Sequence, residues 1–139
     1  MTRGNVSTPK LVEEFYTRIW NRGELDDLSD LLASEFTFRG SLGVELNGHD
    51  PFKDYVHSIR GSLYDYHCEI LTCVSEGDRA FAKMRFSGRH TGLFRGYEPT
   101  GETVQWLGAA LFRFEDDRIV EVWVLGDLVG LNARLSQNQ

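Results

Sequence analysis

The spacing of apolar residues changes along the chain, and this change constrains the fold more than any other feature. Over most of the chain up to Gly61, apolar residues recur every three to four positions, as on one face of a helix. Beyond that point they alternate with polar residues, as in strands that bury a single face. Because helices come first and most strands come later, the order predicts an α+β class.

Three helices are predicted in the first part of the chain, at residues 7–23, 24–33 and 50–61. Thr8 and Asp50 can cap the first and third of these, and Pro9 and Pro51 then fall in the first turn. One early strand and four later strands are predicted, at residues 35–40, 66–75, 79–90, 102–115 and 119–126. Residues 41–48 and 91–101 are predicted to be loops.

A long antiparallel sheet twists strongly, so helices laid across its concave face would enclose a cone-shaped space. The prediction is therefore a single domain over residues 1–139, in which a curved sheet wraps around N-terminal helices. A pocket between helices and sheet follows from this geometry. On the strand at residues 102–115, Trp106 and Phe112 share one face with the small residues Gly108 and Ala110, which leaves room for a hollow.

Composition excludes several classes of function. The net charge of −6 argues against a nucleic-acid partner. No run of 18 apolar residues and no N-terminal signal pattern is present, so no membrane partner is expected and the cytoplasm is the expected compartment. Cys68 and Cys73 are five positions apart in one strand and should not pair. Four scattered His residues give no ligand spacing, so neither a metal nor a cofactor is expected.

Asp127 is the most informative single residue, because its neighbours Trp123, Val124, Leu125 and Leu128 are all apolar. One interpretation is a carboxylate that faces a pocket and has a raised pKa, suited to proton abstraction next to a carbonyl. The alternative is a cap for the following turn, or a pair with Arg113. Strand arginines such as Arg113 more often make cross-strand pairs with glutamates than bind substrate.

The C-terminal half carries a set of short motifs whose combination is specific. The motifs are His90-Thr91-Gly92-Leu93-Phe94, Gly96, Pro99-Thr100-Gly101, Phe112-Arg113-Phe114, and Ile119, Glu121, Trp123, Asp127, Gly130 and Leu131. In this the chain resembles the SnoaL-like polyketide cyclase or ester cyclase family, within the nuclear transport factor 2-like superfamily. The order and spacing of the early helices agree, so the resemblance covers nearly the whole chain.

The resemblance implies a cone-shaped α+β barrel with a hydrophobic pocket, usually in a homodimer or higher homo-oligomer. It also implies that Asp127 acts as general acid/base in a metal-free and cofactor-free aldol cyclisation. Some cyclases of this kind pair the Asp with a His on the preceding strand, where this chain has Arg113. His90 is the remaining candidate, either to orient Asp127 or to polarise a carbonyl; the alternative is a surface His on a loop.

Aromatic side chains are the candidates for the pocket walls, with ordinary core packing as the alternative for each. They are Tyr16, Trp20, Phe36, Phe38, Trp106, Phe112 and Trp123. Two hypotheses of function follow. The first is a cofactor-independent enzyme that abstracts a proton from a hydrophobic carbonyl compound, giving ring closure or a shifted double bond. The second is a small-molecule binding or scaffold module with the same pocket and no chemistry.

Overall fold

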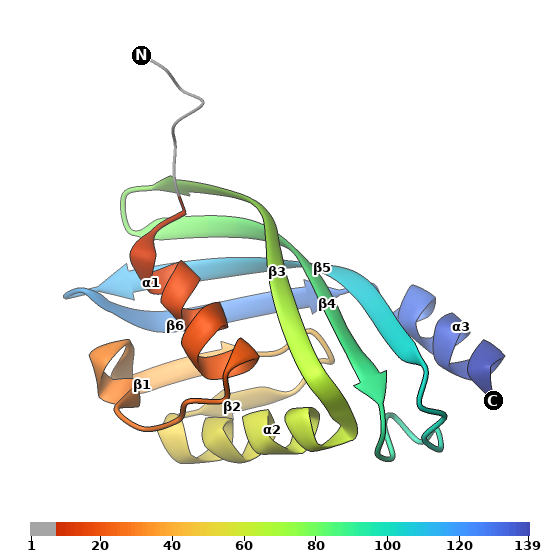
Figure 1. The fold of residues 1–139 in the computed structure, drawn as a ribbon. Helices are drawn as coiled ribbons and strands as arrows, with labels where there is room; N and C mark the ends of the chain where they lie inside the picture. Colours follow the sequence, from red (N-terminus) through yellow and green to blue (C-terminus); the bar gives the residue numbers. More distant parts are fainter. Residues whose placement is uncertain (1–7) are drawn as a thin grey trace.

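The computed structural model describes residues 8–139, which form a six-stranded curled sheet with helices on one face and at one end (Figure 1). The helical elements are α1 (Lys10–Glu14), η2 (Phe15–Asn21), η3 (Leu28–Asp30), α2 (His49–Ser62) and α3 (Leu128–Asn138). The strands are β1 (Leu32–Arg39), β2 (Glu45–Asn47), β3 (Leu63–Glu76), β4 (Arg79–His90), β5 (Thr103–Glu115) and β6 (Arg118–Gly126). The predicted α+β class is confirmed.

The strand order in the sheet is β2-β1-β6-β5-β4-β3. β3, β4, β5 and β6 form the predicted antiparallel meander, and β1 joins it by parallel pairing with β6. The sheet is therefore mixed and curls around the first helix, which lies across its concave face (Figure 1). Among residues 8–139, no helix is both long and apolar enough to cross a membrane.

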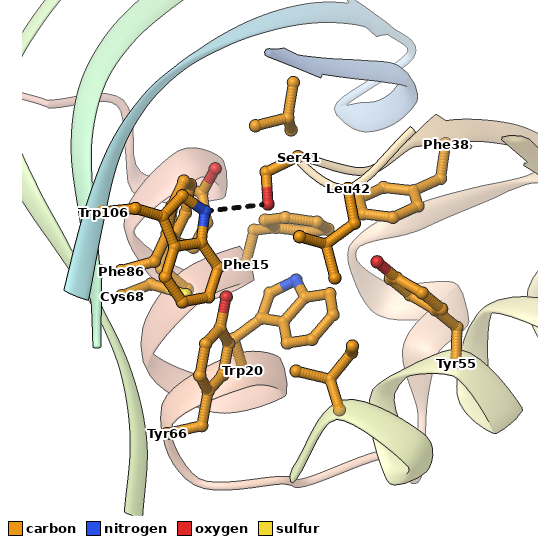
Figure 2. A pocket seen from close by; sticks show the side chains of 13 residues that line it. Phe15, Trp20, Phe38, Ser41, Leu42, Tyr55, Tyr66, Cys68, Phe86 and Trp106 are labelled. Carbon is orange, nitrogen blue, oxygen red and sulfur yellow. Dashed lines mark hydrogen bonds between the residues drawn. The ribbon is translucent and has the colours of Figure 1, made fainter. Parts of the chain in front are cut away.

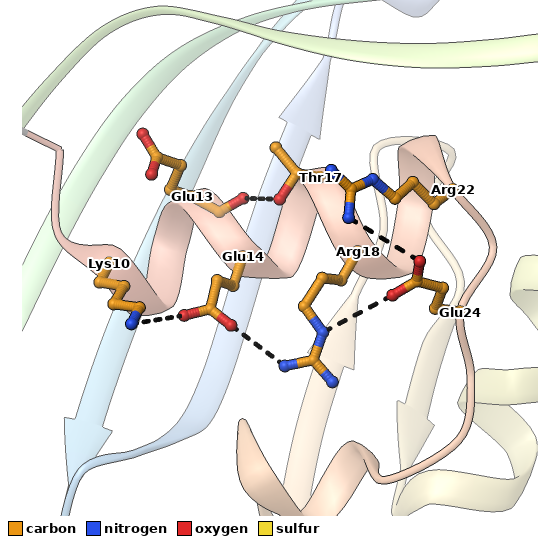
Figure 3. Close-up of polar contacts among 7 residues, drawn as sticks. All are labelled: Lys10, Glu13, Glu14, Thr17, Arg18, Arg22 and Glu24. Atoms are coloured by element: carbon orange, nitrogen blue, oxygen red, sulfur yellow. Dashed lines mark hydrogen bonds and ion pairs between the residues drawn. The ribbon is translucent and has the colours of Figure 1, made fainter.

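The first helix begins at Lys10, one residue after Pro9, and runs as α-helix into a π-helical segment. Its solvent side carries a chain of ion pairs that joins Lys10, Glu14, Arg18 and Glu24 (Figure 3). Its other side is buried against the sheet. Ion pairs on a solvent-facing side contribute little individually, so burial of the apolar side is what fixes this helix in place.

The helix predicted at residues 24–33 is wrong. Only a single 3-10 turn forms at Leu28–Asp30, and Asp27 before it has a left-handed backbone with φ of 58°. Leu32 already belongs to β1, where it pairs with Ile119 of β6. Leu28, Leu31 and Leu32 are buried, but pairing with a distant strand overrides the local helical spacing.

Other boundaries also differ from the sequence predictions; for example, β3 begins at Leu63 rather than at residue 66. The loop predicted at residues 41–48 contains β2, which pairs with β1 from Thr37↔Asn47 to Arg39↔Glu45. The third predicted helix begins at His49 rather than Asp50, with Gly48 as its N-cap, and it passes through Gly61 to end at Ser62. By contrast, the predicted span of β4, 79–90, agrees with the structure at both ends.

Alternation along the last two strands decides which side chains face the helices. From β5 the buried side chains are Val104, Trp106, Ala110 and Phe112, and from β6 they are Val120, Val122 and Val124 together with Ile119. Leu107 and Leu111 on β5, and Trp123 and Leu125 on β6, point to the outer face and remain exposed. Cys68 and Cys73 are both free, as predicted.

Candidate functional site

A small cavity lies between the first helix, α2 and the inner face of the sheet (Figure 2). Its volume is about 20 Å³, which is room for about one water molecule. It is lined by Phe15, Tyr16, Trp20, Phe38, Ser41, Leu42, Tyr55, Ile59, Tyr66, Cys68, Phe86, Trp106 and Val124. These side chains are mostly aromatic or aliphatic, so the cavity favours an apolar occupant, and a ring-sized occupant must displace side chains to enter.

The lining residues carry no carboxylate, no imidazole and no cationic group. Their polar side-chain atoms are hydroxyls, the indole N–H groups of Trp20 and Trp106, and one thiol. Burial raises the pKa of Tyr16 and of Tyr66 well above the usual value, and it raises the pKa of Tyr55 to about 12. Burial also raises the pKa of the Cys68 thiol. All four groups therefore stay protonated at neutral pH and can act as hydrogen-bond donors without charge.

The turn between β1 and β2 supplies Ser41 and Leu42, and the side chain of Leu42 points into the cavity (Figure 2). The turn is closed by its own backbone bonds, from Gly40 to Val44 and from Gly43 to Gly40. The Trp106 indole donates from Nε1 to Ser41 Oγ over 3.4 Å. Because this side-chain bond is long, it holds the turn only weakly to the cavity wall.

Two glycines let the walls approach closely. A Cβ on Gly126 would lie 2.9 Å from both the Cβ and the carbonyl oxygen of Ser41. A Cβ on Gly108 would lie 2.6 Å from Phe86 Cε2 and 2.8 Å from the carbonyl oxygen of Leu125. Both distances are below ordinary contact, so larger residues at these positions would push the wall out of place.

Asp127 lies outside this cavity. It is exposed and directly precedes α3, where its Oδ1 accepts a hydrogen bond from the Gly130 backbone N–H at 3.0 Å. This is the N-cap geometry, in which a side chain satisfies a free donor of the first helical turn. The inner positions at this end of β6 are held by Val122 and Val124. The expectation that Asp127 faces the pocket is therefore wrong, and the capping alternative describes its position.

The model of the SnoaL-like polyketide cyclase family matches residues 10–135. The chain belongs to this family. Comparison with curated proteins returns no match.

Solved structures agree with this SnoaL-like fold. TsrD from Streptomyces laurentii is 26% identical, with 97% of each chain covered and a TM-score of 0.79. A SnoaL-like polyketide cyclase from Agrobacterium tumefaciens is 21% identical, with 92% of this chain and 99% of that chain covered and a TM-score of 0.75. A protein from Catenulispora acidiphila with a ketosteroid isomerase-like fold, in complex with trimethylamine, is 17% identical, with 94% and 95% covered and a TM-score of 0.78.

His90, the second candidate in the SnoaL-like motif set, is completely buried. Its Nε2 lies 3.1 Å from the carbonyl oxygen of Tyr97, while its Nδ1 has no partner among the described residues. The ring packs edge-on against Phe94, with centroids 6.1 Å apart, and Phe94 in turn packs against Trp106. The surface alternative is thus wrong, but His90 also does not line the cavity. Its contacts hold the loop after β4.

The seven aromatic candidates divide into three groups. Tyr16, Trp20, Phe38 and Trp106 line the cavity. Phe36 and Phe112 are fully buried but belong to the core behind it. Trp123 is 42% exposed on the outer face of the sheet, where Arg39 lies over its ring at 5.4 Å. Its expected place in the pocket is wrong because strand alternation directs Val122 and Val124 inward instead.

Nine other lining residues were not anticipated as site residues: Phe15, Ser41, Leu42, Tyr55, Ile59, Tyr66, Cys68, Phe86 and Val124. Alternation along β3 places Tyr66 and Cys68 on one face, so this pair was open to prediction from the sequence. Ser41 and Leu42 reach the cavity only because β1 and β2 form a hairpin. Two of the strand arginines make the expected cross-strand pairs, Arg85 with Glu69 at 2.9 Å and Arg113 with Glu121 at 3.3 Å, whereas Arg89 lies over the ring of Tyr64.

Proposed function

We propose that this SnoaL-like protein binds a hydrophobic carbonyl compound of polyketide type in the aromatic cavity and promotes its cyclisation or isomerisation without a cofactor. The observation that supports the proposal most strongly is the composition of the cavity wall. Eight aromatic side chains from the helices and the sheet surround a space whose polar groups are uncharged donors, among them Tyr16, Trp20 and Trp106. Membership of the polyketide cyclase family supports the same class of ligand.

The wall also limits the chemistry. An intramolecular aldol closure requires loss of a proton next to one carbonyl and attack of that carbon on another carbonyl. A tight apolar cavity favours a folded conformation in which the two carbons are close. Hydroxyl donors that hold the developing enolate oxygen lower the barrier further. Because the lining residues provide no carboxylate or imidazole, the proton acceptor has to lie at the cavity entrance.

Asp127 is the candidate for that acceptor in the acid/base version of the proposal. It follows Gly126, whose Cα faces Ser41 so closely that a Cβ there would lie 2.9 Å from the serine. Ser41 lines the cavity, so Asp127 stands one residue from its rim. A substrate that extends past the turn would bring a carbonyl-activated C–H toward this carboxylate. This is the single observation that favours proton abstraction by Asp127.

Binding can be tested without knowing the natural substrate, because two of the three tryptophans line the cavity and the third, Trp123, lies outside it. In a Trp123→Phe variant all tryptophan emission comes from the cavity wall. We expect 1-tetralone, a bicyclic ketone, to quench this emission saturably. An emission that does not respond to 1-tetralone or to larger aromatic ketones would contradict the proposal.

Turnover can be tested with 1-phenylhexane-1,5-dione. Its intramolecular aldol condensation forms one C–C bond, releases one water and yields 3-phenylcyclohex-2-enone, which absorbs in the near ultraviolet. We expect the protein to accelerate this ring closure above the rate in buffer. If aromatic ketones bind and no ring closure of this or related diketones is accelerated, the protein is a small-molecule binding module instead.

We also propose that a second copy of this chain covers the outer face of the sheet. Four exposed apolar side chains form a row across four strands, since Val74 pairs with Phe81, Phe81 with Leu111, and Leu111 with Trp123. A contiguous exposed apolar surface of this kind is typical of an interaction site. Its rim carries both signs of charge, for example Arg85 and Glu69, as two identical surfaces in contact require.

A further inference from the structure

The hydroxyl of Tyr16 is the one polar group of the cavity wall that is buried without a hydrogen-bond partner among the described residues. The side chain is 2% exposed. A buried hydroxyl without a partner is unfavourable, and native structures rarely retain one without a reason. Since the residue lines the cavity, a bound molecule can supply the missing acceptor.

The ring of Tyr16 is held firmly. It meets Phe15 and Phe112 edge-on, with centroid distances of 5.1 and 5.9 Å. The residue lies in the π-helical segment η2, at whose end Arg22 N bonds to Thr17 O, five residues back. Single π-helical turns occur frequently at functional sites. In this segment Phe15, Tyr16, Ile19 and Trp20 are all buried, so its inner face is wide enough to present Tyr16 beside Trp20.

The surroundings of Tyr16 select the charge of its partner. Cys68 is near enough to influence both Tyr16 and Tyr66, and burial raises the pKa of all three groups. They are neutral, and the other lining residues carry no cation. A carboxylate or phosphate at this place would lose its hydration without gaining a counter-charge. A ketone or quinone oxygen accepts a hydrogen bond without that loss.

We infer that Tyr16 determines specificity, by donating its hydroxyl to a neutral carbonyl oxygen on the edge of a bound ring system. The inference rests on the proposed function, and it narrows the ligand to cyclic ketones or quinones, as against acids and plain hydrocarbons. Tyr16 then distinguishes a ketone from a hydrocarbon of the same shape, because only the ketone satisfies the buried hydroxyl.

The test compares 1-tetralone with tetralin, which has the same two rings and no oxygen. Affinities are measured by cavity tryptophan emission in the Trp123→Phe background, with and without Tyr16→Phe. We expect 1-tetralone to bind about tenfold more weakly after Tyr16→Phe, the loss of one neutral hydrogen bond, while the affinity of tetralin is unchanged or improved. Tyr55→Phe is the matched control, since Tyr55 also lines the cavity and its hydroxyl lies beside Gly40 of the turn.

A spectroscopic readout separates hydrogen bonding from a change of shape. With ¹³C-labelled carbonyl, the C=O stretch of bound 1-tetralone should lie at lower wavenumber than in an apolar solvent. Tyr16→Phe should abolish this shift and Tyr55→Phe should preserve it.

The outcomes separate this inference from the proposed function. If both probes bind equally in all variants, or if Tyr55→Phe removes the shift instead, the assignment of Tyr16 is wrong while the cavity remains a ligand site. If neither probe binds to the unsubstituted cavity, the proposed function fails and the inference fails with it.

Discussion

Trp106 Nε1 donates to Ser41 Oγ across 3.4 Å, and this hydrogen bond joins the β1–β2 turn to the wall of the cavity. Removing it should loosen the turn and ease entry. We expect Ser41→Ala to cost at most about 1 kcal/mol of stability and to raise the association rate of 1-tetralone, measured by stopped-flow tryptophan emission. Ser34→Ala is the control, because Ser34 is exposed and its hydroxyl donates to the neighbouring Glu35. An association rate identical in the two variants would mean that the turn does not limit entry.

Tyr16→Phe should stabilise the unliganded protein although it weakens ketone binding. The hydroxyl has no partner among residues 8–139, so folding removes it from water without compensation. We expect the free energy of unfolding to rise by about 1 kcal/mol in urea titrations. A loss of stability of similar size would show that the hydroxyl is satisfied in solution, for example by a trapped water. Tyr64→Phe, at an exposed tyrosine, should change little.

Gly108→Ala should destabilise the cavity wall. The added Cβ would lie 2.6 Å from Phe86 and 2.8 Å from a backbone oxygen, so the strands must shift. We expect a loss of about 1–3 kcal/mol, measured by chemical unfolding. Gly61→Ala is the opposite control, since this position lies inside α2 with nothing within 4 Å. There we expect a gain of about 0.5–1 kcal/mol from the better helix propensity. Equal effects at the two positions would contradict the close packing at Gly108.

Two substitutions can separate the helix-capping role of Asp127 from its proposed catalytic role. Asn caps helices as well as Asp, whereas Ala does not. We therefore expect Asp127→Ala to lose about 1 kcal/mol of stability and Asp127→Asn to lose almost none. The rate of diketone closure is then measured in Asp127→Asn. A rate at least hundredfold lower in this stable variant would assign general-base catalysis to Asp127. An unchanged rate would limit its role to the cap.

The row of apolar side chains on the outer face should hold two copies together. Placing a charge in the row, by Leu111→Glu, should shift the protein toward monomers in sedimentation velocity runs. Val129→Glu is the control, because Val129 is 84% exposed on α3 and stands outside the row. If the unsubstituted protein sediments as a monomer, this interface is ruled out. If Val129→Glu causes the shift toward monomers, the interface lies on α3 instead.

Alkaline pH should destabilise the fold through the cavity tyrosines. Burial raises the pKa of Tyr55 to about 12, whereas in the unfolded chain it returns to about 10. The folded pKa is the higher one, so the contribution is complete below pH 10 and is lost as the pH rises toward 12. We expect the stability to fall over this interval, and the fall to be smaller in Tyr55→Phe. A pH profile identical in that variant would mean that Tyr55 is accessible to water.

Strand alternation made much of the sheet predictable from the sequence. Polar and apolar residues alternate along residues 79–90 and stop where β4 stops. On β5 the same alternation places Trp106, Ala110 and Phe112 together on the inner face. Applied to β6, it also puts Trp123 outside and Val124 inside, so the error at Trp123 came from weighting aromatic character above position. The Asp at position 127 is also a residue type that favours a helix N-cap, and its side chain accepts from the Gly130 N–H three residues on.

The sequence by itself thus determined the α+β class, the meander and the faces of its strands, because these depend on neighbours within a few residues. Only the tertiary structure decided that residues 24–33 do not form the predicted helix, because Leu32 pairs with Ile119 of β6. It also decided the cavity, which joins Tyr16, Ser41, Tyr55 and Trp106 from four distant segments. The burial of the Tyr16 hydroxyl without a partner among residues 8–139 is likewise a result of packing between distant segments, which no local sequence pattern encodes.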